Sequence, residues 1–133
     1  MRKQLLSAVR LRPRALWLAA LVVGLVATPA LAAPLCTPEL AITGADLSQI
    51  RASQRVWTAR VAVDASSCST TSGGFFIRFV RLKETAPDLR FAEPFTWRPG
   101  VVEVSTTFAA DEAVLDYSIG YVRPCACREI GAR

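Results

Sequence analysis

Cysteine has the widest chemical scope of any residue type in this chain of 133 residues, and two of the four cysteines lie one residue apart near the C-terminus. Cys125 and Cys127 flank a single alanine, whereas Cys36 and Cys68 lie far upstream. Four thiols with this spacing allow three kinds of chemistry: structural disulfides, a redox-active Cys-Ala-Cys bridge, or a metal site with thiolate ligands. The choice between them depends on the compartment of the protein and on the elements that position the four residues.

The residue type that many catalytic and metal sites use is missing from this chain. It contains no histidine, which excludes nucleophilic triads that use imidazole and metal sites with histidine ligands. Paired carboxylates remain an option for acid–base chemistry, and the densest acidic cluster is Asp111, Glu112 and Asp116. These acids lie in and beside a predicted turn, where we expect them to be solvated, with calcium binding as the alternative. We therefore predict that the protein is not an enzyme and has no catalytic residue, no cofactor and no metal site.

The first 32 residues have the composition of a secretory signal peptide. Met1–Arg14 carries five basic residues and no acid, and Ala15–Ala27 contains no charge. Ala30-Leu31-Ala32 supplies the small residues that signal peptidase recognises. An uncleaved membrane anchor is the alternative, but the apolar run is shorter than the roughly 20 residues that span a bilayer. We predict that residues 1–32 are removed and that residues 33–133 form one periplasmic or secreted domain, which does not insert into a membrane.

The predicted signal peptide accounts for the whole formal charge of +5, because its five basic residues have no acidic counterpart within it. The rest of the chain is near neutral, so the main electrostatic reason to expect a nucleic-acid or anionic-membrane partner disappears. The arginines of the central region are interspersed with acids, and we interpret them as residues of solvated strand faces. They are Arg51, Arg55, Arg60, Arg78, Arg81, Arg90, Arg98 and Arg123.

Residues 33–133 alternate between apolar and polar positions with a period of two, and no segment shows a convincing helical stripe. About 100 residues suffice for one domain, and export makes disulfides available to stabilise it. The pattern predicts an all-β fold, an antiparallel, immunoglobulin-like sandwich of two sheets with six to seven strands. The six predicted strands are 40–47, 55–64, 75–82, 89–97, 102–108 and 114–122.

Particular residues specify the place of several strands. Trp57 lies on the apolar face of the second strand, so we expect it in the core. The apolar positions change parity at Gly44, which indicates a β-bulge. Pro94 cannot donate a ladder hydrogen bond, so its strand is expected at a sheet edge or broken. Strand 75–82 is apolar on both faces, which predicts a strand that is central in its sheet or whose outer face is covered by another segment; an exposed partner site is the alternative.

The turns and the last strand complete the predicted sandwich. Turns are predicted over 83–88, at Arg98-Pro99-Gly100 and over 109–113. The last strand alternates again, and four of its apolar side chains share one face, which we expect to cover the core. These side chains are Leu115, Tyr117, Ile119 and Tyr121.

Three segments resemble fibronectin type III and immunoglobulin-like modules of bacteria. These are Trp57 on the second strand, the late strand Tyr117–Val122, and Phe95-Thr-Trp-Arg-Pro-Gly100. The last of them is similar to the Trp-x-Pro-Gly stretch of the adhesion-type modules called CARDB. The resemblance is one of pattern, extends over roughly Glu39 to Arg123, and lacks a clear seventh strand. It implies a β-sandwich module of the immunoglobulin-like kind.

Strand parity brings the four cysteines together. If consecutive strands run antiparallel, the start of the first strand and the ends of the second and sixth strands lie at one pole of the sandwich. Cys36 precedes the first strand, Cys68 follows the second, and Cys125 and Cys127 follow the sixth. In an extended tail the Cα atoms of Cys125 and Cys127 would be about 6.5–7 Å apart, at or beyond the usual range for a disulfide. We therefore predict two disulfides in which Cys36 and Cys68 each pair with one of the tail cysteines, and either pairing remains open.

The leading functional hypothesis is an exported, non-enzymatic β-sandwich module that binds a protein or cell-surface partner. The loop Ala65–Gly74, beside the cysteines, is the first place where we expect a binding surface. The alternative is a thiol–disulfide redox protein or a metal-handling protein that uses Cys125 and Cys127.

Overall fold

The computed structural model describes residues 31–131, so nearly all of the predicted signal peptide (residues 1–32) lies outside the described residues. Within residues 31–131 every regular element is a strand, and no helix there is long and apolar enough to cross a membrane. The prediction of an all-β domain is therefore confirmed.

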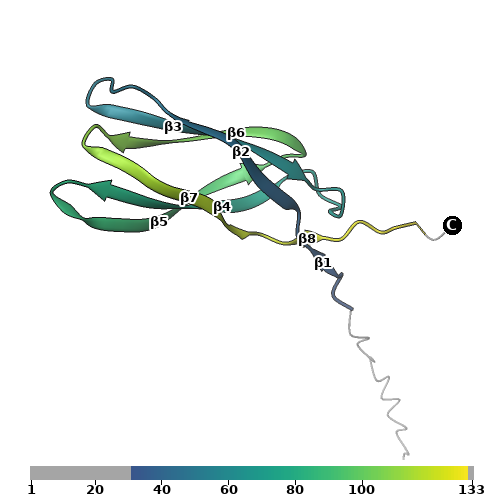
Figure 1. Cartoon of the computed structure of the whole chain (residues 1–133). Helices are drawn as coiled ribbons and strands as arrows, with labels where there is room; N and C mark the ends of the chain where they lie inside the picture. Colours follow the sequence, from purple (N-terminus) through teal and green to yellow (C-terminus); the bar gives the residue numbers. More distant parts are fainter. Residues whose placement is uncertain (1–30, 132–133) are drawn as a thin grey trace, which may run out of the picture. The chain divides into compact units, whose positions relative to one another are not determined.

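Six long strands form two antiparallel sheets, and two short strands form a third (Figure 1). The first sheet has the order β2-β3-β6, and the second has the order β5-β4-β7. The strands of the first sheet are β2 (Glu39–Leu47), β3 (Gln54–Asp64) and β6 (Gly100–Ala109). Those of the second are β4 (Gly73–Lys83), β5 (Ala86–Trp97) and β7 (Glu112–Val122). The short strands β1 (Leu35–Cys36) and β8 (Cys125–Ala126) pair with each other.

The two three-stranded sheets face each other across an aromatic core. The ring of Trp57 on β3 meets the ring of Phe79 on β4 edge-on at 4.8 Å between centroids. Phe79 also contacts Phe108 of β6, at 5.7 Å. Both central strands alternate buried and exposed residues, as the period of two in the sequence requires. These contacts confirm the predicted two-layer sandwich, and Figure 1 shows the layers one above the other.

Two of the strand features predicted from single residues are present. The pairing of β2 with β3 shifts between Ile42 and Gly44, which confirms the bulge. Strand β5 lies at the edge of its sheet and continues through Pro94 without a break. One turn is shorter than predicted: Lys83 at the end of β4 pairs with Ala86 at the start of β5, so the turn predicted over 83–88 comprises only residues 84 and 85.

The prediction for the last strand is partly wrong, because two bulges in β7 change its parity. The pairing of β7 with β4 shifts once between Ile119 and Val122 and again between Val114 and Asp116. Each shift inserts one unpaired residue, and the side chains beyond it change faces. Of the four apolar residues expected on the core face, Tyr117 and Ile119 keep that position. Leu115 and Tyr121 are 54% and 61% exposed, and Val114 and Val122 pack against the core instead.

Arg81 corrects the interpretation that the central arginines all lie on solvated faces. It follows Phe75, Ile77 and Phe79 on the inner face of β4, at the end of the core away from the cysteines. Its guanidinium Nη1 lies 2.7 Å from Oε1 of Glu112, and both side chains are mostly buried. The second carboxylate oxygen of Glu112 accepts a hydrogen bond from the backbone N–H of Ala109. Glu112 is therefore a structural residue, not the solvated acid that the sequence suggested.

We expect Glu112→Gln to lower the free energy of unfolding by about 2 kcal/mol, because Arg81 would keep its charge in a mostly buried position without a counter-ion. Chemical denaturation followed by circular dichroism measures this loss. Asp111→Asn is the matched control, since Asp111 is 56% exposed in its pair with Lys83 at 3.3 Å, and we expect it to cost less than about 0.5 kcal/mol. Equal costs for the two variants would contradict a structural role for the Arg81–Glu112 pair.

Candidate functional site

The four cysteines meet at one pole of the sandwich, as strand parity predicts. Cys36 is bonded to Cys127, with a Cα–Cα distance of 4.9 Å, and Cys68 is bonded to Cys125, with a distance of 5.6 Å. Each upstream cysteine thus has one partner in the tail, and no free cysteine is present in residues 31–131. While these bonds are intact, no thiolate is available to attack a substrate or to bind a metal ion.

The C-terminal tail at Cys125–Cys127 lies between β1 and the loop that contains Cys68. Each tail cysteine is bonded to the cysteine that is not its partner in the strand pairing. In the strand pairing Cys125 is opposite Cys36, yet its disulfide partner is Cys68. Conversely, Cys127 forms a β-bridge with Cys68, and its disulfide partner is Cys36. Parity alone leaves this choice open, because it fixes only which residues share a pole. We call the two bonds and the short β1–β8 sheet the disulfide clasp.

Backbone hydrogen bonds hold the loop Ala65–Gly74 to the tail. The N–H of Ser69 donates to the carbonyl of Ala126 at 2.9 Å, and the N–H of Arg128 donates to the carbonyl of Ser67 at 2.8 Å. Cys68 and Cys125 are buried and belong to the hydrophobic core, whereas Cys36 and Cys127 are only half-buried. The part of this loop nearest the tail is therefore a structural part of the clasp, which weakens its case as the first binding surface.

The entry to this loop is fixed by Asp64. The backbone N–H of Ser66 donates to Oδ1 of Asp64 at 2.9 Å. This bond, followed by a weaker one from the Ser66 hydroxyl, stabilises the ionised carboxylate and holds the pKa of Asp64 below its ordinary range. The ionised carboxylate thereby orders the turn that leads from β3 towards Cys68.

The outer face of β4 is the second candidate surface, and no segment of residues 31–131 covers it. Strand β4 is central, as predicted, but the side chains on its outer face reach solvent. Phe76 and Val80 are half-buried, Arg78 is exposed, and Leu82 is 39% exposed. The other option, a covered outer face, is not realised within residues 31–131, because the two sheets bury only their inner faces against each other. The alternative, an exposed partner surface, fits this geometry.

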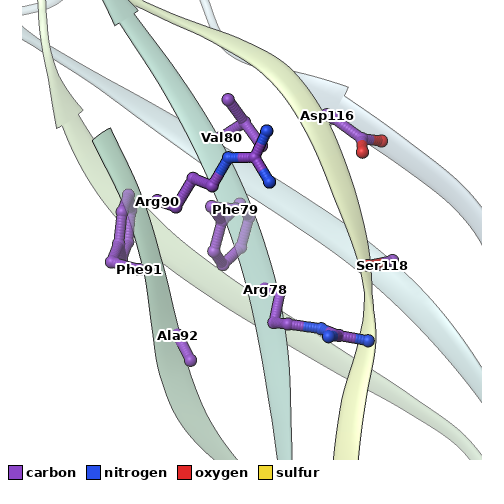
Figure 2. Close-up of a pocket in the computed structure, with 8 residues that line it drawn as sticks. All are labelled: Arg78, Phe79, Val80, Arg90, Phe91, Ala92, Asp116 and Ser118. Carbon is purple, nitrogen blue, oxygen red and sulfur yellow. The ribbon is translucent and has the colours of Figure 1, made fainter. Parts of the chain in front are cut away.

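A shallow depression of about 400 Å³ lies on this outer face, across strands β5, β4 and β7 (Figure 2). Its lining residues are Arg78, Phe79, Val80, Arg90, Phe91, Ala92, Asp116 and Ser118. The guanidinium of Arg78 extends towards β7 beside Ser118, and that of Arg90 lies over the centre of the sheet near Val80 (Figure 2). We call this surface the arginine face.

Two features give the arginine face its shape and charge. A Cβ at Gly120 would lie 3.1 Å from Cγ of Arg78, so the stem of this arginine packs closely on β7 where the chain has no side chain. Among residues 31–131, the two ion pairs are Arg81–Glu112 and Lys83–Asp111. Neither Arg78 nor Arg90 belongs to them, so both guanidinium groups have donors free to bind a carboxylate.

The side chains of the arginine face are suited to binding an anion beside apolar groups. Its two guanidinium groups can each donate two parallel hydrogen bonds to a planar anion, and Val80 and Ala92 offer apolar contact between them. The one acid in the lining, Asp116, has no histidine or cysteine thiol near it to act with. Residues 31–131 also contain no cluster of three or more cysteine, aspartate or glutamate side chains placed to hold a metal ion.

The sequence alone predicts that Arg78 and Arg90 are ordinary solvated residues. The signal that could have found this surface is the run 75–82, where apolar residues occupy both faces and Arg78 interrupts the outer one. What the sequence did not show is that β5 and β7 would bring Arg90 and Ser118 beside it.

Comparison of the chain with protein-family models, curated proteins and solved structures found no match. The resemblance to fibronectin type III and CARDB modules therefore stays a prediction from the sequence pattern.

Proposed function

We propose that this protein is an exported, non-enzymatic β-sandwich module that binds a protein or cell-surface partner through its arginine face. The observation that carries the proposal is the uncovered outer face of β4, where Phe76, Val80 and Leu82 reach solvent on the same face as Arg78 and Arg90, two arginines outside any ion pair. A contiguous surface of this kind is typical of partner-binding sites in otherwise polar monomers. The immunoglobulin-like character predicted from the sequence fits such a role.

The composition of the arginine face indicates the kind of partner it suits. Arginine and aromatic residues are enriched in the central parts of protein interfaces, and arginine often supplies a large share of the binding energy. Arg78 and Arg90 would pair with carboxylates of the partner, while Val80 and Ala92 would contact its apolar side chains. We therefore expect a partner segment that combines acidic and apolar residues.

The disulfides and the predicted signal peptide support a periplasmic or secreted location. Two disulfides that join distant segments persist in an oxidising compartment and are rare in the cytosol. The composition of residues 1–32 matches an export signal. Such a location favours a partner that is itself exported or displayed at a cell surface.

Site-specific photo-cross-linking in the producing cells tests the proposal. With a photo-reactive residue at Val80, we expect a discrete cross-linked product. At Thr58, on the outer face of the opposite sheet and similarly half-buried, we expect none. The charge reversal Arg78→Glu in the Val80 probe should reduce the product about tenfold or more, since it replaces a charge-assisted hydrogen bond with repulsion.

Two outcomes would contradict the proposal. One is the absence of any product from the Val80 probe. The other is a product of equal yield from Val80 and Thr58 that is insensitive to Arg78→Glu, because it would show contact without recognition.

A further inference from the structure

Strand β6 is an edge strand without the features that protect the other three edges of the sandwich. Strand β2 has a bulge at Gly44, and β7 has two bulges. Strand β5 contains Pro87 and Pro94, which cannot donate to a neighbouring strand. Bulges and prolines are the usual means by which edges avoid pairing with other chains. By contrast, β6 pairs with β3 from Gly100 to Ala109 without any shift and contains no proline.

The residues of β6 also favour strand pairing. Its sequence is Gly-Val-Val-Glu-Val-Ser-Thr-Thr-Phe-Ala, rich in β-branched residues and with one charge, Glu103. Val101, on the outer side of the sheet, is 66% exposed. Since β6 is the last strand of its sheet, alternate N–H and C=O groups along it point away from β3 and have no partner strand among residues 31–131.

We propose that β6 pairs antiparallel with β6 of a second copy of this chain, about a two-fold axis at Val104, to form a continuous six-stranded sheet. The occupant is a second copy because the strand is self-complementary in this register. Val104 meets Val104 of the second copy, Val102 meets Thr106, and Val101 meets Thr107. Cross-strand pairs of β-branched residues stabilise a sheet, and a two-fold axis creates each pair twice.

The single charge of β6 disfavours a neighbouring register. With the axis at Val104, each Glu103 lies opposite Ser105 of the second copy, whose hydroxyl can donate to the carboxylate. With the axis one residue earlier, Glu103 would lie opposite itself, and like charges directly across a ladder are destabilising. If the two-fold axis lay between two residues, the apolar inner face of one strand would be on the same side of the sheet as the polar outer face of the other.

This self-association is expected to be weak and dependent on concentration. Pairing of one edge strand buries less area than the interfaces of stable dimers. It uses the first sheet, whereas the arginine face belongs to the second, so the two proposals can fail separately. The association constant of the exported protein is measured by sedimentation velocity over a range of protein concentrations, and we expect a monomer–dimer equilibrium.

Charge substitutions at Ser105 test the register. Ser105 is exposed, so the fold tolerates both Ser105→Glu and Ser105→Lys, which thermal melting verifies. Ser105→Glu places two acids opposite each other at two symmetric positions and should lower the association constant about tenfold. Ser105→Lys places a lysine opposite Glu103 and should maintain or raise it. Thr96→Glu, at an exposed position on the edge strand β5 outside the arginine face, is the control and should have no effect.

Three results would overturn the proposal. A chain that stays monomeric at all concentrations has no self-pairing edge. An association constant that falls equally with Ser105→Glu and Ser105→Lys would place the axis elsewhere. A loss caused by Thr96→Glu, with no effect of either Ser105 variant, would assign the contact to β5.

Discussion

Replacement of Trp57 by alanine is expected to lower the free energy of unfolding by about 3–5 kcal/mol. The indole is 2% exposed and meets Phe79 at 4.8 Å and Tyr117 at 5.2 Å between ring centroids. Trp57 belongs to the first sheet and its two aromatic neighbours to the second, so the substitution opens a cavity between the layers. Small domains have only about 5–15 kcal/mol of stability in total, and the variant is therefore expected to be partly unfolded at moderate temperature.

Guanidinium denaturation with the disulfides intact, followed by circular dichroism, measures this loss. The matched control is Val56→Ala, one residue earlier on β3, where the side chain points to the opposite face and is 41% exposed. We expect the control to cost less than about 1 kcal/mol. Similar costs for the two substitutions would mean that Trp57 does not join the two layers.

Removal of the Cys68–Cys125 disulfide, with both residues changed to alanine, is expected to cost about 4 kcal/mol or more. The two residues are 57 positions apart, and closure of a loop of that length reduces the entropy of the unfolded chain by this amount in the chain-entropy model. The Cys36–Cys127 bond joins residues 91 positions apart, but the entropic cost of closing a loop grows only with the logarithm of its length. The entropic part of the stability lost on its removal should therefore be nearly the same.

Burial distinguishes the two disulfides. Cys68 and Cys125 are 0% and 7% exposed and pack in the core, so their replacement also leaves unfilled space. Cys36 and Cys127 are half-buried. We expect the Cys68→Ala, Cys125→Ala double variant to be the less stable of the two, as measured by urea denaturation.

The same difference predicts the order of reduction, because a reductant reaches the half-buried Cys36–Cys127 bond first. Thiol alkylation after mild reduction, followed by peptide mass spectrometry, should find label on Cys36 and Cys127 before the other two. Label first on Cys68 and Cys125, or a native bond between Cys125 and Cys127, would contradict the clasp. Free thiols or bound metal in the unreduced protein would favour the redox or metal-handling alternative over the binding module.

Much of the sandwich follows from alternation in the sequence. The period of two placed Trp57 in the core and identified the six long strands, because a half-buried strand must alternate apolar and polar residues. Strand parity brought Cys36 and Cys68 to the tail, since parity depends only on the number of strands between two points. The diagonal pairing depends on the path of the tail between its two neighbours, which no local pattern specifies.

The bulges of β7 show why alternation is not sufficient. A bulge changes parity by one residue, and in β7 the residues Leu115 and Tyr121 at or beside the bulges are apolar. A strict period of two therefore assigns them to the core. Gly44 marked the bulge of β2 because the apolar residues themselves changed parity there.

The candidate site was harder to predict than the fold, because it combines residues from three strands. Arg78 lies on β4 and Arg90 on the neighbouring strand β5, where it is paired with Val80 of β4. Strand β7 adds Ser118, which is paired with Arg78. Each of these residues has the appearance of a solvated strand residue within its own segment. The tertiary structure alone shows that no segment of residues 31–131 covers their common face.

The disulfide clasp also determines how the protein responds to mechanical force. Cys36 and Cys127 flank all six long strands, and their Cα atoms are 4.9 Å apart. Tension applied to the chain on either side of the domain would pass through this covalent bond and bypass the 90 residues between the two cysteines. The hydrogen bonds of the two sheets would then bear no load, so the domain could be pulled at both ends without being extended. Reduction of this bond would transfer the force to β2 and β3, whereas the Cys68–Cys125 bond would still bypass β4 to β7.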